Sequence, residues 1–351
     1  MKKVILKIDN ETKFHIGNGQ EILEYIPSDK LYSAIINSLA LTYSKYELNK
    51  LIEIINEKLQ ISSAFMGIKI KNKNKGIEKS IDFLPRPYMY IGNNNIISTQ
   101  LLNRKKFKKI NYVSNNVFLD FNKHYDFKKN FINYDFQQGY IIGEKYYVTD
   151  REINFLSEDE KKYLEKYKPI INESVQRNYI NRFSKESIGT YYDNFKVIVQ
   201  EKYKDMQLIP YFYFYIKGDL EIDKIMYAIL EGGIGGKRSL GAGTIKDISI
   251  EECDDFKENG ERFINISMIY PDKQELNYIE SYALENRNGY IYSQGPTDLK
   301  KPWIRMIKEG GVFTKRIKGN INDINVKDID YPIYTYGKAF FITLGGNLDE
   351  L

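Results

Sequence analysis

A glycine-rich stretch between two regular segments constrains the fold of this chain more than any other feature. Residues 231–244 read Glu-Gly-Gly-Ile-Gly-Gly-Lys-Arg-Ser-Leu-Gly-Ala-Gly-Thr, with six glycines around Lys237 and Arg238. A helix-like run at 221–230 precedes this stretch, and a strand-like run at 244–250 follows it. Because glycine tolerates positive φ and leaves backbone N–H groups open to an anion, the pattern predicts a phosphate-binding loop between a helix and a strand.

Two familiar nucleotide-binding loops do not fit this stretch. A Walker A loop needs Ser or Thr after its lysine, whereas Arg238 follows Lys237. A dinucleotide-binding loop lies before a helix, whereas this loop follows one, so the helix dipole presents its negative end. Any anion affinity must then come from loop N–H groups, Lys237 and Arg238. The candidate contact residues are Gly232, Gly233, Gly235, Gly236, Lys237, Arg238, Ser239, Gly241 and Gly243.

A structural interpretation of the same loop stays open. A helix C-cap needs a single glycine in the left-handed region, and a basic pair beside it can simply be solvated. Six glycines exceed what a cap requires, which favours the phosphate-binding interpretation.

The composition limits the classes of function that the chain can serve. A length of 351 residues suggests two domains, and a net charge of +5 permits an RNA partner without requiring one. Thirty Tyr and nineteen Phe offer stacking surfaces, although most aromatic residues pack in cores. One Cys and two His argue against a disulfide framework or a Cys- or His-rich metal site, so we expect no metal and no cofactor. No apolar run approaches the roughly 20 residues of a membrane helix, so we expect a soluble, cytoplasmic protein without a membrane partner.

The order of predicted elements indicates an α+β fold with antiparallel sheets. A strand at 4–9 is followed by a helix at 28–39, for which Ser28 is the expected N-cap. If residues 48–185 are set aside as a large insertion, the remaining order is strand, helix, strand, strand, helix, strand. The later elements of this series are the strands at 189–199 and 208–216, the helix at 221–230 and the strand at 244–250.

This βαββαβ order is typical of ferredoxin-like, or RRM-like, domains. We therefore predict a first domain over 1–250, with the insertion at about 48–185 and the glycine loop at 232–243. Residues 251–351 can repeat the pattern as a second ferredoxin-like domain, with a hairpin that turns at Asn286–Gly289.

Six segments spread over the chain together resemble the RAMP superfamily of CRISPR RNA-binding proteins. The glycine loop alone is typical of RAMP proteins. Its combination with Ser-Asp-x-Leu-x-Ser-Ala and Leu-Pro-x-Pro resembles the type III-A, or Csm-complex, subunit that caps the 5′ handle of the guide RNA. The segments are 14–19, 26–34, 83–87, 177–182, the glycine loop and 334–339.

The resemblance implies an RNA-binding subunit of an antiviral defence complex, with two RRM-like domains and no catalysis by this chain. The implied partners are the 5′ handle of the guide RNA (crRNA), the large polymerase-like Csm subunit and the adjacent backbone RAMP subunit. Further candidate RNA-binding residues, outside the glycine loop, are His15, Asn18, Lys30, Arg86, Arg177 and Arg182. For the arginines, pairing with surface carboxylates is the alternative role.

His15 carries the alternative function. In RAMP ribonucleases a histidine can act as general base on a 2′-hydroxyl, so a metal-independent RAMP endoribonuclease that processes CRISPR precursor RNA is the competing hypothesis. No partner acid or tyrosine motif accompanies His15, which favours a structural or RNA-contacting role.

A nucleotide-binding enzyme is a third hypothesis, which the failed loop patterns disfavour. The basic run Arg104–Lys109 is either a solvated surface segment or a contact with RNA or a partner.

Overall fold

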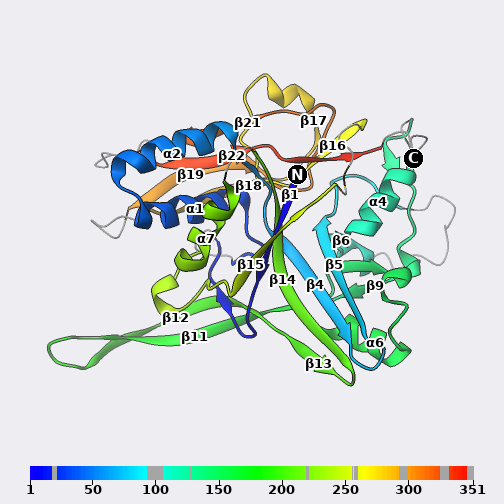
Figure 1. The fold of residues 1–351 in the computed structure, drawn as a ribbon, viewed down its shortest axis with the longest axis horizontal. Helices are drawn as coiled ribbons and strands as arrows, with labels where there is room; N and C mark the ends of the chain where they lie inside the picture. The colour runs from blue at the N-terminus through cyan, green and yellow to red at the C-terminus, as the bar shows by residue number, and fades with distance from the viewer. Residues whose placement is uncertain are drawn as a thin grey trace.

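A ten-stranded sheet forms the centre of the computed structural model of this protein (Figure 1). The structure describes residues 1–17, 22–92, 106–126, 128–218, 221–254, 256, 260–291, 299–324 and 332–345. The main path of the sheet follows the order β15-β1-β14-β4-β5-β6-β10-β9, and its neighbours are antiparallel except for β10 beside β6. These strands span Asp247–Glu252, Lys2–Lys7, Met206–Lys217, Phe65–Asn72, Ile77–Pro85, Tyr112–Ser114, Tyr146–Thr149 and Gly139–Ile142. The short strands β3 (Gln60–Ile61) and β13 (Glu201–Tyr203) also pair with β14.

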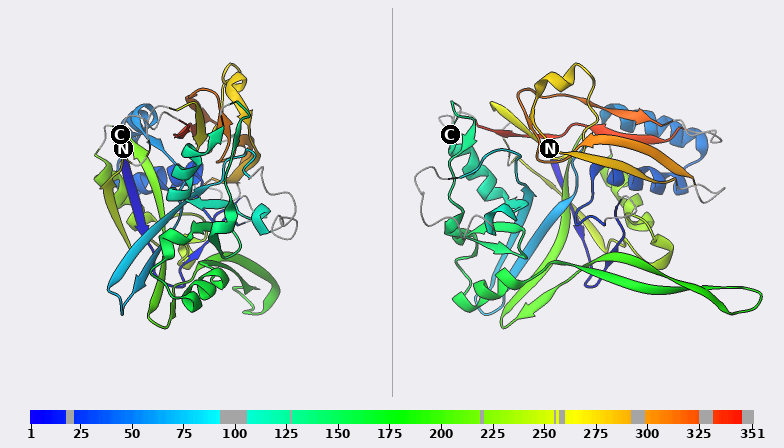
Figure 2. Two further views of the ribbon diagram at one scale, coloured as in Figure 1. Left: turned by 90° about the vertical axis from the view of Figure 1, so that its right-hand side faces the viewer. Right: turned by 180° about the vertical axis from the view of Figure 1, so that it is seen from behind.

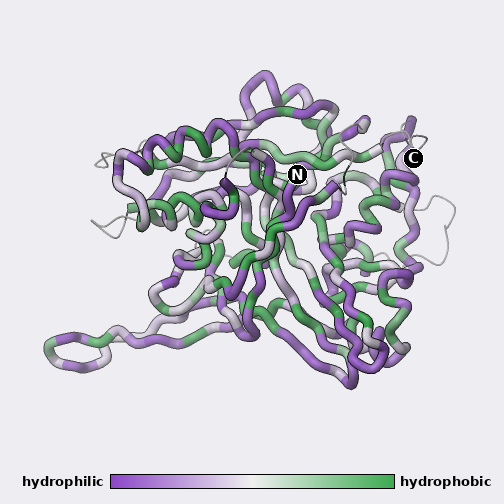
Figure 3. The backbone as a smooth tube through the Cα atoms, in the orientation of Figure 1, coloured by the Kyte–Doolittle hydropathy of each residue, from purple (hydrophilic) through white to green (hydrophobic). Residues whose placement is uncertain are grey.

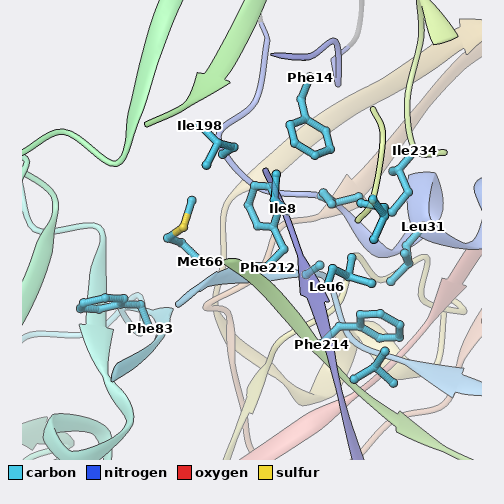
Figure 4. Close-up of a cluster of buried hydrophobic side chains, with 14 of the residues drawn as sticks. Leu6, Ile8, Phe14, Leu31, Met66, Phe83, Ile198, Phe212, Phe214 and Ile234 are labelled. Atoms are coloured by element: carbon cyan, nitrogen blue, oxygen red, sulfur yellow. The ribbon is translucent and has the colours of Figure 1, made fainter. Parts of the chain in front are cut away.

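Strand β14 divides the hydrophobic interior into two layers, because successive side chains of a strand point to opposite faces. Phe212 and Phe214 pack in a core with β1 and the helices α1 (Ser28–Thr42) and α7 (Ile222–Gly232). Figure 4 shows both rings in this core beside Leu6 and Leu31. The tyrosines of β14 face the other way, into a core that includes α4 (Asn115–Lys123). Accordingly, hydrophobic residues follow the central strands in Figure 3.

Helix α1 forms where its apolar periodicity predicts, since Leu31, Ile35 and Leu39 are all buried. The expected N-cap is wrong, however. Pro27 occupies the N-cap position, and the Ser28 hydroxyl accepts a hydrogen bond from the backbone N–H of Met268 at 3.0 Å. A polar side chain at a helix start thus serves a long-range contact instead of a local one.

The remaining helices are short and lie mostly beyond the central strands. Helix α6 begins after a capping box formed by Ser157 and Glu160, a local signal that the sequence carries in full. Helix α6 spans Glu158–Lys166, and the helices α2 and α5 span Lys45–Lys58 and Asp150–Ile153. Three 3-10 turns, η1 to η3, span Phe136–Gln138, Arg238–Leu240 and Glu275–Tyr278, and a short hairpin joins β7 (Tyr125–Asp126) to β8 (Phe131–Ile132).

One predicted strand assignment is wrong. The predicted βαββαβ order implies that strands 189–199 and 208–216 share one sheet. Strand β12 (Ser187–Ile198) pairs instead with β11 (Ile170–Ile180) and β2 (Lys13–Phe14). Strand β4 takes the place beside β14, from within the segment predicted to be an insertion. The physical reason is burial, because β4 is apolar and buried nearly throughout whereas the first half of β12 is exposed.

The chain beyond residue 250 is rich in strands. A four-stranded sheet has the order β17-β20-β16-β23, and two-stranded sheets form from β18 with β19 and from β21 with β22. Among its described residues this region contains no α-helix, so the second βαββαβ series is not confirmed. The strands β16 to β23 span Arg262–Asn265, Ile279–Ser281, Leu284–Tyr290, Lys300–Ile307, Val312–Phe313, Gly319–Asp323, Tyr334–Lys338 and Phe341–Leu344.

The hairpin predicted to turn at Asn286–Gly289 is also wrong, because these residues lie inside β18. Strand β18 pairs with β19, with a register irregularity between Arg287 and Gly289. Asn-Gly pairs commonly mark turns, and here the irregularity accommodates the glycine within a strand.

The structure confirms a mixed α+β class with antiparallel sheets. The proposed boundary at 250 stays a prediction, and contacts across it are close. The backbone N–H of Ser63 donates to Ile266, and α1 packs against β22. No helix within the described residues is long and apolar enough to cross a membrane.

Candidate nucleic-acid interface

The glycine loop turns sharply back on itself after α7. Gly233, Gly235, Gly241 and Gly243 all have positive φ, between 66° and 98°. Between them Ile234 is fully buried, and Figure 4 shows it in the core beside Leu31. The loop is therefore anchored by an apolar side chain at one end, and its exposed part is the segment from Gly236 to Gly241.

Most backbone N–H groups of this loop already have partners within the chain. Gly236 donates to the His15 carbonyl at 2.9 Å, and Gly243 donates to the Lys13 carbonyl at 2.7 Å. Further N–H donors within the loop are Gly233, Ile234, Leu240, Gly241 and Ala242. These donors stabilise the turn itself and leave fewer N–H groups for an anion, so the predicted phosphate contact stays a prediction.

Close packing explains several of the glycines. A Cβ on Gly232 would lie 2.0 Å from the Ser38 hydroxyl of α1, and one on Gly243 would lie 2.0 Å from the Ile234 carbonyl. A Cβ on Gly236 would lie 3.0 Å from the His15 ring. Larger residues at these positions would push the loop away from its neighbours, so the structural interpretation accounts for a large part of the glycine pattern.

A buried carboxylate joins the glycine loop to the β11–β12 hairpin. Asp193 of β12 accepts from Lys237 Nζ at 2.8 Å and from Arg177 Nε at 3.0 Å. Its side chain is 5% exposed, whereas those of Lys237 and Arg177 are about one-third exposed. Burial alone would raise the pKa of Asp193, but Lys237 and Arg177 together hold that pKa below its usual value. The bridge therefore brings together two residues predicted to bind RNA.

His15 lies in the same neighbourhood. Its Nδ1 is 2.9 Å from the Asn194 carbonyl of β12, and its ring meets Phe195 edge-on with centroids 6.0 Å apart. With its own carbonyl held by Gly236, His15 links three segments of chain. It is half-buried, so part of its ring still faces solvent.

The hairpin of β11 and β12 extends from the body of the protein as a long arm (Figures 1 and 2). Tyr179 stacks near Tyr191 with ring centroids 4.5 Å apart, and Lys237 Nζ lies 5.9 Å from the Tyr191 ring. Arg182 is exposed at the tip, next to Phe183, whose side chain is 99% exposed. The arm thus carries both aromatic and basic side chains, a composition that suits RNA bases and phosphates.

An open groove of about 520 Å³ lies at the base of the arm. It is lined by Ile22, Asn172, Glu173, Ser174, Asn194, Phe195 and Lys196. Its amide and hydroxyl groups are suited to hydrogen-bond to a nucleobase, whereas the Phe195 ring is only 2% exposed. The nearby lysines are largely balanced, since Lys13 pairs with Glu173 at 2.7 Å and Lys196 pairs with Glu24 at 3.1 Å.

Two predicted residues lie elsewhere in the molecule. Arg86 donates to the Phe107 carbonyl at 2.9 Å and lies 5.2 Å from the centre of the Phe136 ring, and burial lowers its pKa. Lys30 donates to the Asn288 carbonyl at 3.1 Å, under the C-terminal strands.

Of the other predictions, Asn18 lies outside the described residues, as does the start of the basic run 104–109. Ser239 is exposed on η2, and Arg238 donates to the Gly232 carbonyl at 2.8 Å.

Sequence reasoning missed Asp193, Tyr191 and Asn194. A signal for Asp193 does exist, because Tyr191, Asp193, Phe195 and Val197 alternate along β12 and turn toward the protein. A lone carboxylate in such an inward series predicts a cationic partner. No group of three or more Cys, His, Asp or Glu side chains in the described parts of the chain could hold a metal ion.

Known proteins resemble this chain in sequence and in architecture. The family model of the CRISPR Csm4 C-terminal domain matches residues 258–344. A CRISPR system protein Csm4 from Methanocaldococcus jannaschii is 27% identical over 395 aligned positions, which cover 100% of this chain and 99% of that protein. A Csm4 from Streptococcus thermophilus is 25% identical over 132 residues, or 35% of this chain and 44% of that protein.

Solved structures show the same fold. One chain in the crystal structure of a Csm3–Csm4 subcomplex from a type III-A CRISPR-Cas interference complex aligns with a TM-score of 0.62 and 22% identity, over 97% of this chain and 99% of that one. A chain of a Csm1–Csm4 cassette in complex with cA4 aligns with a TM-score of 0.52 and 14% identity, over 98% of both chains. Sequence and fold agree, and this chain resembles the Csm4 proteins of CRISPR systems over its whole length.

Proposed function

We propose that this chain is a non-catalytic RNA-binding subunit of a type III-A CRISPR effector complex. In the proposal it binds the 5′ handle of the guide RNA and contacts both the large polymerase-like subunit and the adjacent backbone subunit. The partners follow from the related structures, in which Csm4 occurs in a Csm3–Csm4 subcomplex and in a Csm1–Csm4 cassette. The assembly would act in the cytoplasm, in antiviral defence.

The observation that carries the RNA-binding part of the proposal is the convergence at Asp193. Lys237 of the glycine loop, Arg177 of the arm and the loop containing His15 all meet there, beside the open groove. Positive groups that follow an extended surface beside aromatic rings suit a single strand of RNA, whose backbone contacts provide most of the affinity. The cations hold the phosphates, while Tyr179 and Tyr191 provide rings for stacking.

The strand order supports an RRM-like unit within this assembly. In the series β1, α1, β4, β14, α7, β15, the four strands lie in the sheet order β15-β1-β14-β4 with both helices packed in one core. That is the connectivity of a ferredoxin-like unit once β4 replaces the strand first predicted. For the second unit we propose the four-stranded sheet around β16 as its centre.

Co-expression tests the assembly directly. The chain would be produced with a CRISPR array and the other effector subunits, and the material that co-purifies with it would be identified. We expect guide RNA, the large subunit and the backbone subunit. Recovery of the chain alone, with every other component expressed, would refute the assembly proposal.

The glycine-loop contact is tested by Lys237→Ala with Arg238→Ala. We expect weaker incorporation of guide RNA, and a salt slope of RNA binding that falls by about 1 for each phosphate that the variant no longer binds. Lys45→Ala with Lys50→Ala on the exposed surface of α2 removes the same charge and serves as control. Normal incorporation by the loop variant at physiological salt would show that the loop does not bind the handle.

A cleavage assay separates the proposal from the endoribonuclease alternative. Repeat-containing RNA would be incubated with the purified chain in EDTA. We expect intact RNA, because the His15 Nδ1 contacts the backbone carbonyl of Asn194 and not a carboxylate that would support the ring as a general base. Cleavage that disappears in His15→Ala would establish the enzyme instead of the binding subunit.

A further inference from the structure

A second basic cluster lies under the C-terminal strands, outside the glycine-loop interface. Arg287 of β18, Lys301 of β19, and Asp29 and Lys30 in the first turn of α1 line a cavity of about 10 Å³. The cluster joins segments more than 250 residues apart in sequence, since Arg287 and Asp29 are separated by 258 positions.

The centre of the cluster is a buried ion pair. Arg287 donates to both carboxylate oxygens of Asp29, through Nε at 3.1 Å and through Nη2 at 3.0 and 3.1 Å. The two side chains are 2% and 8% exposed. A fork of this kind is strong and directional, and it fixes β18 against the start of α1.

The remaining donor of the guanidinium is unsatisfied. Arg287 Nη1 is buried and has no hydrogen-bond partner within the described residues, and the same holds for the Asn288 amide oxygen beside it. A buried donor without an acceptor destabilises a protein, so such groups usually mark an unfilled contact.

The cluster also carries more positive than negative charge. Lys30 Nζ donates to the Asn288 carbonyl and Lys301 Nζ to the Tyr334 carbonyl, both at 3.1 Å, so neither lysine has a carboxylate of its own among the described residues. Three cations therefore share Asp29. Burial, together with repulsion from Arg287 and Lys301, lowers the pKa of Lys30 to about 8 against the opposing effect of Asp29. Burial and Arg287 likewise lower the pKa of Lys301.

These features select the chemistry of a ligand. A cation would be repelled, and an apolar group would leave Arg287 Nη1 unsatisfied. A water molecule could accept from Arg287 and donate to the Asn288 amide oxygen, but it would not offset the surplus charge. An anionic oxygen accepts from Arg287 and offsets that charge, and a flipped Asn288 amide would turn its NH2 group toward the anion. The positive end of the α1 dipole favours an anion further. The ion pair consists of Arg287 and Asp29 alone, so it does not explain why Lys30 and Lys301 lie beside it.

We propose that Arg287, Lys30 and Lys301 form a binding site for a phosphate oxygen of the bound RNA backbone, separate from the glycine loop. The cavity admits one oxygen-sized group, so it fits a single oxygen of a phosphate and not the whole group. The identity of the anion as RNA rests on the proposed function, whereas the affinity for an oxyanion rests on this cluster alone.

The first experiment uses the full chain with inorganic phosphate. Thermal unfolding is compared in phosphate and in chloride at equal ionic strength, because a ligand of the native state raises Tm with its concentration. Lys301→Gln and Lys30→Gln remove one charge each and leave the Arg287–Asp29 pair intact. Arg305→Gln, on the exposed face of β19, is the matched control.

We expect phosphate to raise the Tm of the wild type and of Arg305→Gln by the same amount, and to raise that of the two lysine variants less. Any general effect of the salt is common to all four proteins and cancels in this comparison. Equal shifts in all four proteins would overturn the site and leave only a buried water or an adventitious ion.

A second measurement reports on Lys30 in a way that a purely structural role would not. Because an anion beside Lys30 raises its lowered pKa, sulfate binding near pH 8 should be accompanied by proton uptake. Calorimetry in two buffers of different ionisation enthalpy measures this uptake, and sulfate itself does not titrate at this pH. The uptake should vanish in Lys30→Gln. Binding of sulfate without proton uptake by the wild type would overturn the proposal.

A third arm uses single-stranded RNA and keeps the two proposals distinguishable. If the site holds an RNA phosphate, Lys301→Gln should lower the salt slope of RNA binding by about 1, in addition to the effect of the glycine-loop variant. An unchanged slope, with normal RNA affinity, would overturn the phosphate site and leave the proposed function standing. Binding of the free oxyanions without any RNA binding would instead refute the RNA assignment and the proposed function together.

Discussion

Two basic clusters in this molecule balance their charge in opposite ways. At the arm, Lys237 and Arg177 share Asp193, and both cations are about one-third exposed. Under β18 and β19, Arg287 donates to both carboxylate oxygens of Asp29, and Lys30 and Lys301 donate to backbone carbonyls. In the exposed cluster the carboxylate thus contacts both cations, while in the more buried one two of the three cations have no carboxylate within ion-pair distance among the described residues.

This difference shows that exposure alone does not identify the cations available to a ligand. RNA that binds Lys237 must compete with Asp193, so part of the attraction goes into breaking an existing pair. An oxyanion at Lys30 and Lys301 displaces no carboxylate and satisfies a donor that is already desolvated. Four experiments test how far this contrast holds.

The largest expected effect comes from Arg287→Met. The substitution removes the cation that hydrogen-bonds to the buried Asp29 carboxylate and leaves only the weaker Coulombic attraction of Lys30 and Lys301, which should lower the free energy of unfolding by about 3–5 kcal/mol. Urea unfolding measures the change, with the exposed Arg305→Met as control. A decrease below about 1 kcal/mol would mean that Lys30 or Lys301 replaces Arg287, and the contrast between the clusters would fail.

Two glycine substitutions test whether the loop beside the exposed cluster is a structural device. Gly243 and Gly241 have nearly the same φ, 79° and 81°, but a Cβ on Gly243 meets the Ile234 carbonyl whereas one on Gly241 meets no described atom within 4 Å. We expect Gly243→Ala to lower the free energy of unfolding by about 2–3 kcal/mol and Gly241→Ala by about 1 kcal/mol. Equal decreases in urea unfolding would show that packing does not explain Gly243.

Asp193→Asn tests the competition between the internal carboxylate and RNA. Removal of the bridge should lower the free energy of unfolding by only about 1 kcal/mol, because both cations can turn to solvent. RNA affinity should rise and its salt dependence should steepen, since Lys237 and Arg177 are released. If affinity falls instead, Asp193 positions these cations for RNA and does not compete with it.

The smallest effects are in the pH dependence of stability, where stability should rise with pH at both clusters but in different pH ranges. The pKa of Asp193 is lowered, so its contribution is complete above the ordinary value of about 4 and is lost as pH falls through the folded value. The pKa of Lys30 is lowered to about 8, so between this value and its ordinary pKa the unfolded chain binds more protons and stability rises with pH.

Urea unfolding of the wild type, Asp193→Asn and Lys30→Gln from about pH 3 to about pH 10 measures both slopes. The acidic slope should weaken only in the first variant, and the alkaline rise only in the second. A wild-type profile that is flat between about pH 8 and pH 10 would contradict the charge surplus assigned to the buried cluster.

The sequence predicted those features whose signals lie within a few residues of each other. The spacing of Leu31, Ile35 and Leu39 located α1, and Ser157 with Glu160 located the start of α6. The glycine loop was correctly placed between a helix and a strand. Six short segments were enough to show the resemblance to RAMP proteins. Local periodicity, capping and turn chemistry act over one or two turns of chain, so one sequence is enough to see them.

The candidate site was predicted in part. Arg177 and Lys237 were both expected to bind RNA, but nothing local showed that they share Asp193, because Asp193 lies 44 positions before Lys237. The loop N–H groups were expected to face a ligand, and they bond instead to segments such as that of His15.

Only the tertiary structure decided which distant segments meet. It placed β4, and not 189–199, beside β14, and it put Arg287 inside a strand that covers Asp29. Many pairings satisfy the same local patterns, and the choice among them depends on which strand buries both faces and which charge finds a partner. Such interactions join residues up to 284 positions apart, as between Tyr25 and Glu309, so they belong to the folded whole and not to any stretch of the sequence.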